Sequence, residues 1–285
     1  MKKQLMLGTL CLLVYGSLPG LLHAQSCTGL SGKAGSFEKT LTSGGLSRTY
    51  RLHVPASYDA SKGTPLILSF HGVTSNGLEM EQVSHAIATS DKAGFIIAHP
   101  DGYGESWNAG WCCAPATTKN VDDVKFARDL VAAIAKEYCI SPAQIYAMGF
   151  SNGGFMSHRL GCEAADLFAA IGPHSGEIAI RSCTPVREVP VIQVHGTSDA
   201  VVPYKAGVNS VEEWAALNGC SSTKSKVYEK GTATCEVYDG CALNASVELC
   251  TIKRWGHDWA TWNKTNGNID ATDFIWDFFK SHPKN

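Results

Sequence analysis

The sequence lacks the patterns that mark several classes of protein. Its 285 residues carry a formal net charge of −2, without a basic excess or a long run of one sign, so no nucleic-acid partner is expected. It has no C-x-x-C pair and no H-E-x-x-H motif, so neither a metal site nor another cofactor is expected. No internal repeat and no low-complexity linker divides it. With 44% hydrophobic residues, it is long enough for one large α/β domain.

The first residues are typical of a secretory signal. Lys2 and Lys3 precede a mostly apolar stretch over residues 5–22, and Ala24 offers a cleavage point. The alternative is a membrane anchor, but glycines and Pro19 interrupt the apolar run. We therefore expect residues 1–24 to be a cleaved signal peptide, residues 25–285 to form a single secreted catalytic domain, and no membrane association after cleavage.

Cysteine usage agrees with export to an oxidising compartment. Of 11 cysteines, Cys11 lies in the signal and ten remain, an even number that predicts five disulfides. Their connectivity cannot be assigned from the sequence. Because a ring closed between neighbouring cysteines is strained, we expect the adjacent Cys112 and Cys113 to bridge to different partners.

The order of the expected elements predicts the fold class. A hairpin is expected over residues 36–54, and strands and helices then alternate, which predicts a mostly parallel sheet with helices on both faces. The segment from Cys220 to Cys250 has four cysteines and little helical pattern, and we expect a disulfide-pinned insertion there. Strands are expected over 65–70, 95–98, 145–148, 167–171, 189–194 and 246–252, and helices over 79–92, 122–138, 210–218 (with Ser210 opening a capping box) and 270–280.

The most informative motif is the pentapeptide over residues 149–153, Gly-Phe-Ser-Asn-Gly. It follows an expected strand and precedes a stretch compatible with a helix, which is the nucleophile-elbow pattern of the α/β-hydrolase fold. The turn is so sharp that side chains two residues either side of the serine would clash with backbone, so glycine is needed there. The alternative is a simple turn of small residues. The context favours Ser151 as a nucleophile.

A serine nucleophile needs a base and an orienting carboxylate, which in this fold follow in the order acid, then histidine. Asp199 follows the strand expected over 189–194, and His257 follows the strand expected over 246–252, so loops at one sheet edge can bring both to Ser151. Asp258 is the rival acid, but neighbouring residues rarely place a carboxylate on the far nitrogen of the imidazole. The other candidates, His158, His174, His195 and His282, are interpreted as structural or surface residues.

Acyl transfer also requires donors for the oxyanion. The backbone N–H of Asn152, directly after the nucleophile, is one expected donor. The loop after the strand over 65–70 supplies the second, for which we predict the N–H of Val73 with Gly72 as the alternative.

Five segments stand out in the sequence: His71-Gly72, the Trp-Asn-Ala-Gly-Trp-Cys-Cys run over 107–113, Val121-Asp122-Asp123-Val124, residues 149–154 and residues 195–199. In this order they resemble a secreted esterase family that contains polyhydroxybutyrate depolymerase-like proteins and the type C feruloyl esterases of carbohydrate esterase family 1. The resemblance spans nearly all of the mature chain, and it implies an α/β-hydrolase fold with Ser151, Asp199 and His257 as the catalytic triad. The family often has threonine after this histidine and proline after the following tryptophan, whereas this chain has Asp258 and Ala260.

The resemblance implies a serine esterase, most closely a feruloyl esterase that releases ferulic and related hydroxycinnamic acids from arabinoxylan. Trp107, Trp111 and Trp259 are expected to bind substrate, because aromatic rings stack on phenolic groups and sugars. The alternatives are a polyhydroxybutyrate depolymerase, an acetylxylan esterase, or a catalytically inactive binding protein on a hydrolase scaffold. We expect a monomer whose partner is an ester-bearing polysaccharide or a small ester.

Overall fold

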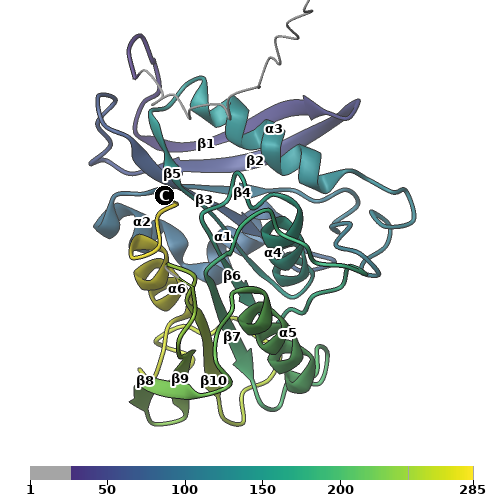
Figure 1. Ribbon diagram of the computed structural model, residues 1–285. Helices are drawn as coiled ribbons and strands as arrows, with labels where there is room; N and C mark the ends of the chain where they lie inside the picture. The colour runs from purple at the N-terminus through teal and green to yellow at the C-terminus, as the bar shows by residue number, and fades with distance from the viewer. Residues whose placement is uncertain (1–26, 243, 285) are drawn as a thin grey trace, which may run out of the picture.

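The computed structural model describes residues 27–242 and 244–284, so the expected signal peptide lies outside the described residues. Their strands form one sheet in the order β1-β2-β4-β3-β5-β6-β7-β10-β9-β8 (Figure 1). The strands are β1 (Gly35–Ser43), β2 (Leu46–Val54), β3 (Thr64–Phe70), β4 (Ile96–Pro100), β5 (Ile140–Phe150), β6 (Ala170–His174), β7 (Val191–Gly196), β8 (Lys224–Lys230), β9 (Ala233–Tyr238) and β10 (Val247–Ile252).

The middle of the sheet is parallel and its edges are antiparallel. Strands β4, β3, β5, β6, β7 and β10 run parallel, whereas β1 and β2 at one edge and β9 and β8 at the other pair antiparallel. The helices are α1 (Gly77–Ser84), α2 (Ala86–Ala93), α3 (Asp123–Ala135), α4 (Asn152–Glu163), α5 (Tyr204–Leu217) and α6 (Ala271–Lys280).

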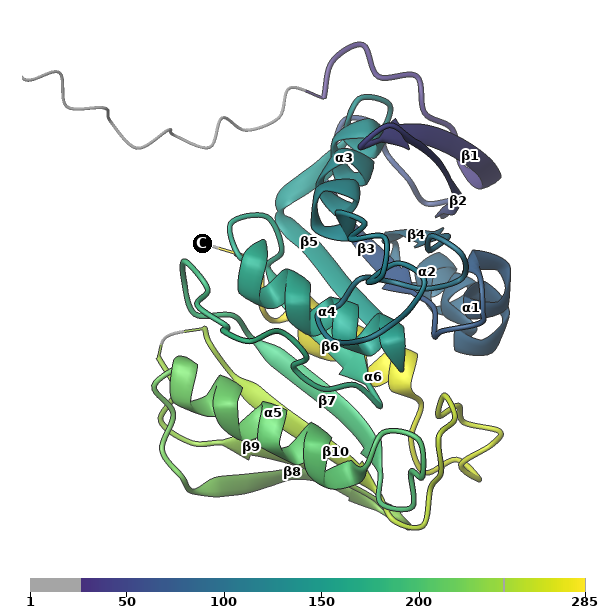
Figure 2. The same ribbon diagram turned by 90° about the vertical axis from the view of Figure 1, so that its right-hand side faces the viewer.

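The helices cover both faces of the sheet, as predicted. Helices α3, α4 and α5 lie on one face, and α1, α2 and α6 lie on the other (Figures 1 and 2). Successive side chains of a strand point to opposite faces of the sheet, so one strand contributes side chains to two hydrophobic cores. In β3, Leu66 and Leu68 join the core under α3, α4 and α5, whereas Ile67 joins the core under α6. The mostly parallel sheet expected from the alternation and the α/β-hydrolase fold implied by the resemblance are both confirmed.

Two helices differ from the predicted ones. The helix expected over 79–92 is divided at His85, whose φ of 52° is left-handed and ends α1 before α2 begins. Helix α5 begins at Tyr204, after Pro203, and not at Ser210. Ser210 lies inside the helix, where its Oγ donates to the carbonyl of Ala206 at 3.0 Å, so the predicted capping box is wrong.

The segment over residues 220–250 is pinned by disulfides, as predicted. Cys220 bonds to Cys241, and Cys235 bonds to Cys250. The segment continues the main sheet, because β10 pairs with β7 on one side and with the β8–β9 hairpin on the other. No helix in the described part of the chain is long and apolar enough to span a membrane.

The ten cysteines of the described residues form five disulfides, as predicted, but one pairing corrects an expectation. Cys112 and Cys113 bond to each other, across a cis peptide bond with Cα atoms 3.1 Å apart, instead of bridging to different partners. The physical reason lies in the tertiary structure, where the other eight cysteines are paired among themselves. Those pairs are Cys27–Cys139, Cys162–Cys183, Cys220–Cys241 and Cys235–Cys250.

Candidate active site

The predicted catalytic residues follow three strands that end at the same edge of the sheet. Ser151 follows β5, Asp199 follows β7, and His257 lies on the loop after β10. Strand β3, which ends at the same edge, leads into Gly72 and Val73. In parallel sheets, ligands bind outside the carboxyl ends of the strands, so this edge is where a site is expected.

The turn at Ser151 has the strained geometry of a nucleophile elbow. Ser151 lies at φ 53° and ψ −121°, a conformation that costs free energy for a residue with a side chain. A Cβ on Gly153 would lie 2.0 Å from the carbonyl oxygen of Phe70, and one on Gly149 would lie 2.4 Å from that of Gly153. Both glycines of the motif are therefore required by close packing of backbone, as the sequence suggested.

Asp199 holds the imidazole of His257. Its Oδ2 lies 2.7 Å from His257 Nδ1, and its Oδ1 accepts the N–H groups of Val201 and Val202, both at 2.9 Å. Burial acts to raise the pKa of Asp199, but the hydrogen bonds from His257, Val202 and Val201 outweigh it and hold the pKa below its ordinary value. The carboxylate is therefore ionised at neutral pH, and it holds His257 through Nδ1.

The rival carboxylate, that of Asp258, is turned toward a different partner. Both of its oxygens contact Lys264 Nζ, at 2.8 and 2.9 Å, and its side chain is 47% exposed. It is engaged in a surface ion pair, whereas the side chain of Asp199 is fully buried against the imidazole. The geometry thus supports Asp199 as the orienting acid.

Ser151 and His257 line one apolar pocket of about 340 Å³. Its walls come from the loop after β3, from α1 and from the loop after β7, and the ring of Phe150 packs against His257 with centroids 4.7 Å apart. The pocket is of the size in which proteins bind small organic ligands. The lining residues are Gly72, Val73, Ser75, Glu79, Met80, Val83, Phe150, Ser151, Val201 and His257.

The predicted oxyanion donors border the serine. The N–H of Asn152 belongs to the first turn of α4, whose N–H groups have no partner within the helix and lie at its positive end. A Cβ on Gly72 would lie only 3.4 Å from Ser151 Cβ, so the loop after β3 passes directly beside the nucleophile. In the described part of the chain no hydrogen bond engages the N–H of Val73.

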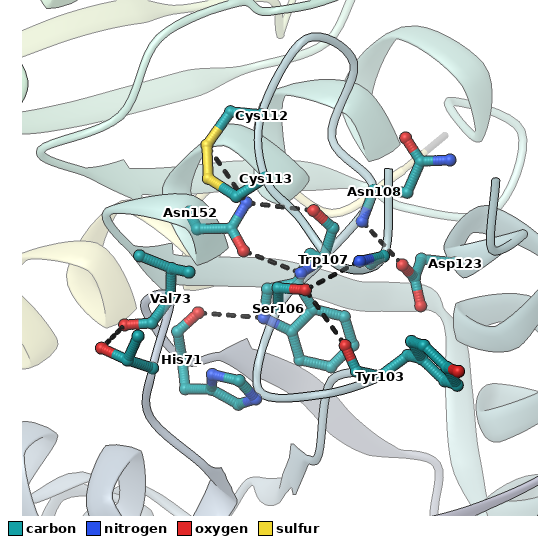
Figure 3. The surroundings of a disulfide bond; sticks show 12 residues. His71, Val73, Tyr103, Ser106, Trp107, Asn108, Cys112, Cys113, Asp123 and Asn152 are labelled. Carbon is teal, nitrogen blue, oxygen red and sulfur yellow. Dashed lines mark hydrogen bonds between the residues drawn. A yellow bond between two sulfur atoms is a disulfide. The ribbon is translucent and has the colours of Figure 1, made fainter. Parts of the chain in front are cut away.

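The side chains of Asn152 and Trp107 fix this arrangement (Figure 3). Asn152 Oδ1 accepts the N–H of Trp107 at 2.7 Å, and its Nδ2 donates to the Trp107 carbonyl at 3.1 Å and faces Cys112 Sγ at 3.7 Å. The indole Nε1 of Trp107 donates to the carbonyl of His71 at 2.9 Å. The loop that carries the disulfide is thereby tied both to the residue after Ser151 and to the loop after β3, where the second oxyanion donor is predicted.

The three tryptophans expected to bind substrate lie in different environments. Trp107 and Trp259 are fully buried, so neither can contact a substrate, and the assignment of these two is corrected. Trp259 stacks on the ring of His174 with centroids 4.9 Å apart, which is a packing role. Trp111 is 68% exposed and stays a prediction. Packing into a core cannot be read from an indole's sequence position.

A buried hydrogen-bond chain beneath the site was missed by the sequence analysis. Trp214 Nε1 donates to His158 Nδ1 at 2.9 Å, and the other nitrogen of His158 faces Gln193 Oε1 at 3.0 Å. The amide of Gln193 lies 3.1 Å from His195 Nδ1. Burial lowers the pKa of His158 to about 3, so it is neutral, and each hydrogen bond then runs in one direction.

This hydrogen-bond chain ends at the carbonyl of Val202, beside the carboxylate of Asp199. Because Gln193 donates to Nδ1 of His195, the ring proton of His195 is on Nε2, which lies 3.0 Å from the carbonyl of Val202 and 3.5 Å from Asp199 Oδ2. Burial lowers the pKa of His195, which keeps it neutral. The position of this histidine just after an expected strand, four residues before Asp199, was the available signal.

Comparison with known proteins agrees with this geometry. Residues 56–238 match the model of the Phospholipase/Carboxylesterase family. Feruloyl esterase B of Piromyces equi is 34% identical over 227 residues, which cover 71% of this chain and 41% of that protein. Probable feruloyl esterase C of Aspergillus oryzae is 31% identical over 238 residues, which cover 81% of this chain and 83% of that protein. The chain thus spans less than half the length of the Piromyces protein.

Solved structures share the fold. An acetyl xylan esterase from Aspergillus awamori superposes with a TM-score of 0.69 at 15% identity, over 87% of this chain and all of that chain. A CE1 ferulic acid esterase from Anaeromyces mucronatus, in complex with ferulic acid, superposes with a TM-score of 0.56 at 15% identity, over 88% of this chain and 90% of that one. The sequence matches and the shared fold lead to one conclusion: this chain belongs to the Phospholipase/Carboxylesterase family of α/β-hydrolases, within which it is similar to feruloyl esterases.

Proposed function

We propose that this chain is a secreted serine ester hydrolase that releases ferulic and related hydroxycinnamic acids from plant cell-wall arabinoxylan. The observation that carries the proposal is the contact of 2.7 Å between Asp199 and His257 at a pocket that Ser151 also lines. The names of relatives that are 34% and 31% identical, both feruloyl esterases, support the substrate class.

The arrangement supports acyl transfer through a covalent intermediate. His257 takes the proton of Ser151 as Oγ attacks the ester carbonyl carbon, while Asp199 stabilises the imidazolium that forms. The N–H groups of Asn152 and Val73 donate to the developing oxyanion. The tetrahedral intermediate collapses, and the sugar alcohol leaves with the proton from His257. Water, activated by the same imidazole, then cleaves the acyl-enzyme to release the acid and restore Ser151.

The pocket favours an aromatic acyl group over a small one. Met80, Val83 and Val201 give it apolar walls, and its volume of about 340 Å³ would be left mostly empty by an acetyl group. A hydroxycinnamoyl group combines an apolar plane with phenolic oxygen. Ser75 and Glu79, which also line the pocket, supply polar atoms that can hydrogen-bond to that oxygen.

Secretion is part of the proposal. The signal-like pattern over residues 1–24 predicts export, and five disulfides suit an oxidising compartment. We propose that the mature protein acts outside the cell as a monomer on ester-bearing polysaccharide.

Hydrolysis assays on three substrates test the substrate class. The purified protein is incubated with methyl ferulate, acetylated xylan and short hydroxybutyrate oligomers, and released acids are measured by chromatography. We expect ferulate release at a kcat/KM at least tenfold above that for either other ester. Rapid cleavage of the oligomers or of acetylated xylan, without ferulate release, would establish one of the alternative esterase activities instead.

Labelling with a fluorophosphonate probe separates an enzyme from an inactive scaffold. An activated serine reacts covalently with the probe, so the wild-type protein should be labelled and the Ser151→Ala variant should not. Equal labelling of both proteins, or of neither, would refute Ser151 as the nucleophile.

A further inference from the structure

One large apolar side chain near the site is held in place yet presented to solvent. Trp111 is 68% exposed, whereas Trp107, Trp214 and Trp259 are fully buried. Its backbone N–H donates to the carbonyl of Ala179 at 3.1 Å. An exposed indole on an anchored backbone loses little conformational entropy when it binds a ligand.

The indole is also fixed by a ring contact. It packs edge-on against the ring of Phe155 on α4, with centroids 5.4 Å apart and an interplanar angle of 88°. The next residue, Cys112, is bonded to Cys113 and lies against the side chain of Asn152 (Figure 3). The side chain is therefore positioned by α4 and by the disulfide-bearing loop, while most of its surface stays available.

Trp111 borders a hollow of about 520 Å³ whose other walls combine apolar residues of the segment over 178–180 with polar side chains. Amide and guanidinium groups of Asn108, Asn120, Arg159 and Arg181 line it. A second hollow, of about 470 Å³, shares the first three of these residues and continues along α3. The two together form a groove that has one aromatic wall and is less apolar than the pocket beside Ser151. Its exposed Asn120 and Arg181 side chains offer hydrogen-bond donors, whereas the guanidinium of Arg159 is engaged with Glu163 and Asn108.

The groove runs away from the nucleophile along α4. Phe155 donates its N–H to the carbonyl of Ser151 at 2.9 Å, one helical turn away, and Arg159 lies a further turn along. Arg159 donates to the carbonyl of Asn108 at 2.6 Å, which joins the groove to the β4–α3 connection that passes over α4 in Figure 2. The acyl pocket lies on the α1 side of Ser151 and the groove on the α4 side.

An ester between an aromatic acid and a sugar has two chemically different halves. The apolar pocket matches the acyl half. The sugar half has apolar C–H faces, which pack on aromatic rings, and a rim of hydroxyl groups, which accept hydrogen bonds from amide and guanidinium groups. We propose that Trp111 and the groove along α4 bind the xylan chain that carries the ester. This inference rests on the proposed function and names where the alcohol half of its substrate lies.

Comparative kinetics of the Trp111→Ala variant test the proposal. The substrates are methyl ferulate, which lacks the sugar chain, and a feruloylated arabinoxylan oligosaccharide, which has it. We expect the ratio of kcat/KM for the oligosaccharide to kcat/KM for methyl ferulate to fall at least tenfold, mainly through KM, with partial recovery in Trp111→Phe. The matched control is Trp262→Ala. Trp262 is 38% exposed and packs beside Phe274 on α6, away from the groove, so its replacement should leave the ratio unchanged.

A binding measurement separates this inference from the proposed function. Ser151→Ala protein is titrated with xylohexaose, which bears no ester, while tryptophan fluorescence is followed. We expect saturable binding by the Ser151→Ala protein and a Kd at least tenfold higher for the variant that carries both Ser151→Ala and Trp111→Ala. Equal affinity of the two proteins, or an unchanged substrate ratio above, would overturn the proposal. Failure of the wild-type protein to hydrolyse methyl ferulate would refute the feruloyl esterase activity, while the titration would still decide whether the groove binds xylan.

Discussion

Replacing Asp199 by asparagine tests the central geometry of the site, because the surroundings dictate how the new side chain must lie. Oδ1 of Asp199 accepts two backbone N–H groups, from Val201 and Val202, both at 2.9 Å. An asparagine must place its oxygen there, so its NH₂ group takes the position of Oδ2, 2.7 Å from His257 Nδ1. His257 must then accept at Nδ1 and carry its proton on Nε2, the nitrogen proposed to take the proton of Ser151.

That tautomer cannot take the proton of Ser151. In serine hydrolases a change of this kind lowers kcat about 10⁴-fold, which corresponds to ~5 kcal/mol of lost transition-state stabilisation. We therefore expect Asp199→Asn to lower kcat for methyl ferulate by about this factor, with KM changed far less. Stopped assays with high enzyme concentration measure the residual rate, and circular dichroism and thermal unfolding check that the variant is folded.

The matched control is Asp258→Asn, which changes the neighbouring carboxylate. Asp258 pairs with Lys264 at the surface, and its loss should alter kcat less than twofold. If Asp199→Asn kept more than a tenth of the wild-type kcat, or if Asp258→Asn lost activity to the same extent, the assigned acid would be wrong.

Three further predictions follow from particular contacts. Gly153→Ala puts a Cβ 2.0 Å from the Phe70 carbonyl oxygen, so we expect loss of soluble protein or a Tm lower by roughly 10 °C or more, and a Tm within 2 °C of wild type would contradict this. Burial raises the pKa of Glu248 from 4.5 to about 7. Between these pH values the unfolded chain has lost this proton while the folded protein keeps it, so the free energy of unfolding falls as the pH rises. Glu248→Gln should therefore stabilise the protein by up to ~3 kcal/mol above pH 7 and by nothing below pH 4.5, as urea unfolding at pH 8 and pH 4 can measure; an equal effect at both pH values refutes the reasoning. Trp107→Phe removes the hydrogen bond of 2.9 Å to the His71 carbonyl, and we expect kcat about fivefold lower at nearly constant KM, whereas a change in KM alone would indicate that Trp107 does not position the oxyanion loop.

Local sequence patterns were sufficient to predict the helices and strands named below and the turn at Ser151. The hairpin over β1 and β2, the strands β3, β4, β5, β7 and β10, and the helices α3 and α6 are near their expected positions, because periodicity and turn residues act over a few neighbouring positions. The glycines around Ser151 were recognisable for the same reason. Ser210 was predicted to begin a helix but lies in the middle of α5. Its Oγ accepts the N–H of Ile178, a residue distant in the sequence, and local patterns cannot predict such a contact.

The disulfide between Cys112 and Cys113 shows most clearly what local sequence patterns cannot predict. An argument from ring strain alone predicts separate partners, but the fold pairs every other cysteine of the mature chain elsewhere. The buried chain from Trp214 to His195 is a second case, since its members come from α4, α5 and β7 and meet only when these elements pack. No spacing of residues in the sequence predicts that these side chains contact one another.

The sequence by itself determined the alternation of strands and helices, the serine turn and the order of serine, acid and histidine, because each depends on backbone conformation or on residues close in the chain. Tertiary structure alone decided that Trp107 and Trp259 are buried while Trp111 is exposed, and that an apolar pocket lies at Ser151 while a less apolar groove follows α4. The reason is that burial and contact are properties of surfaces brought together from distant segments, and they exist only once the sheet has aligned the ends of its strands.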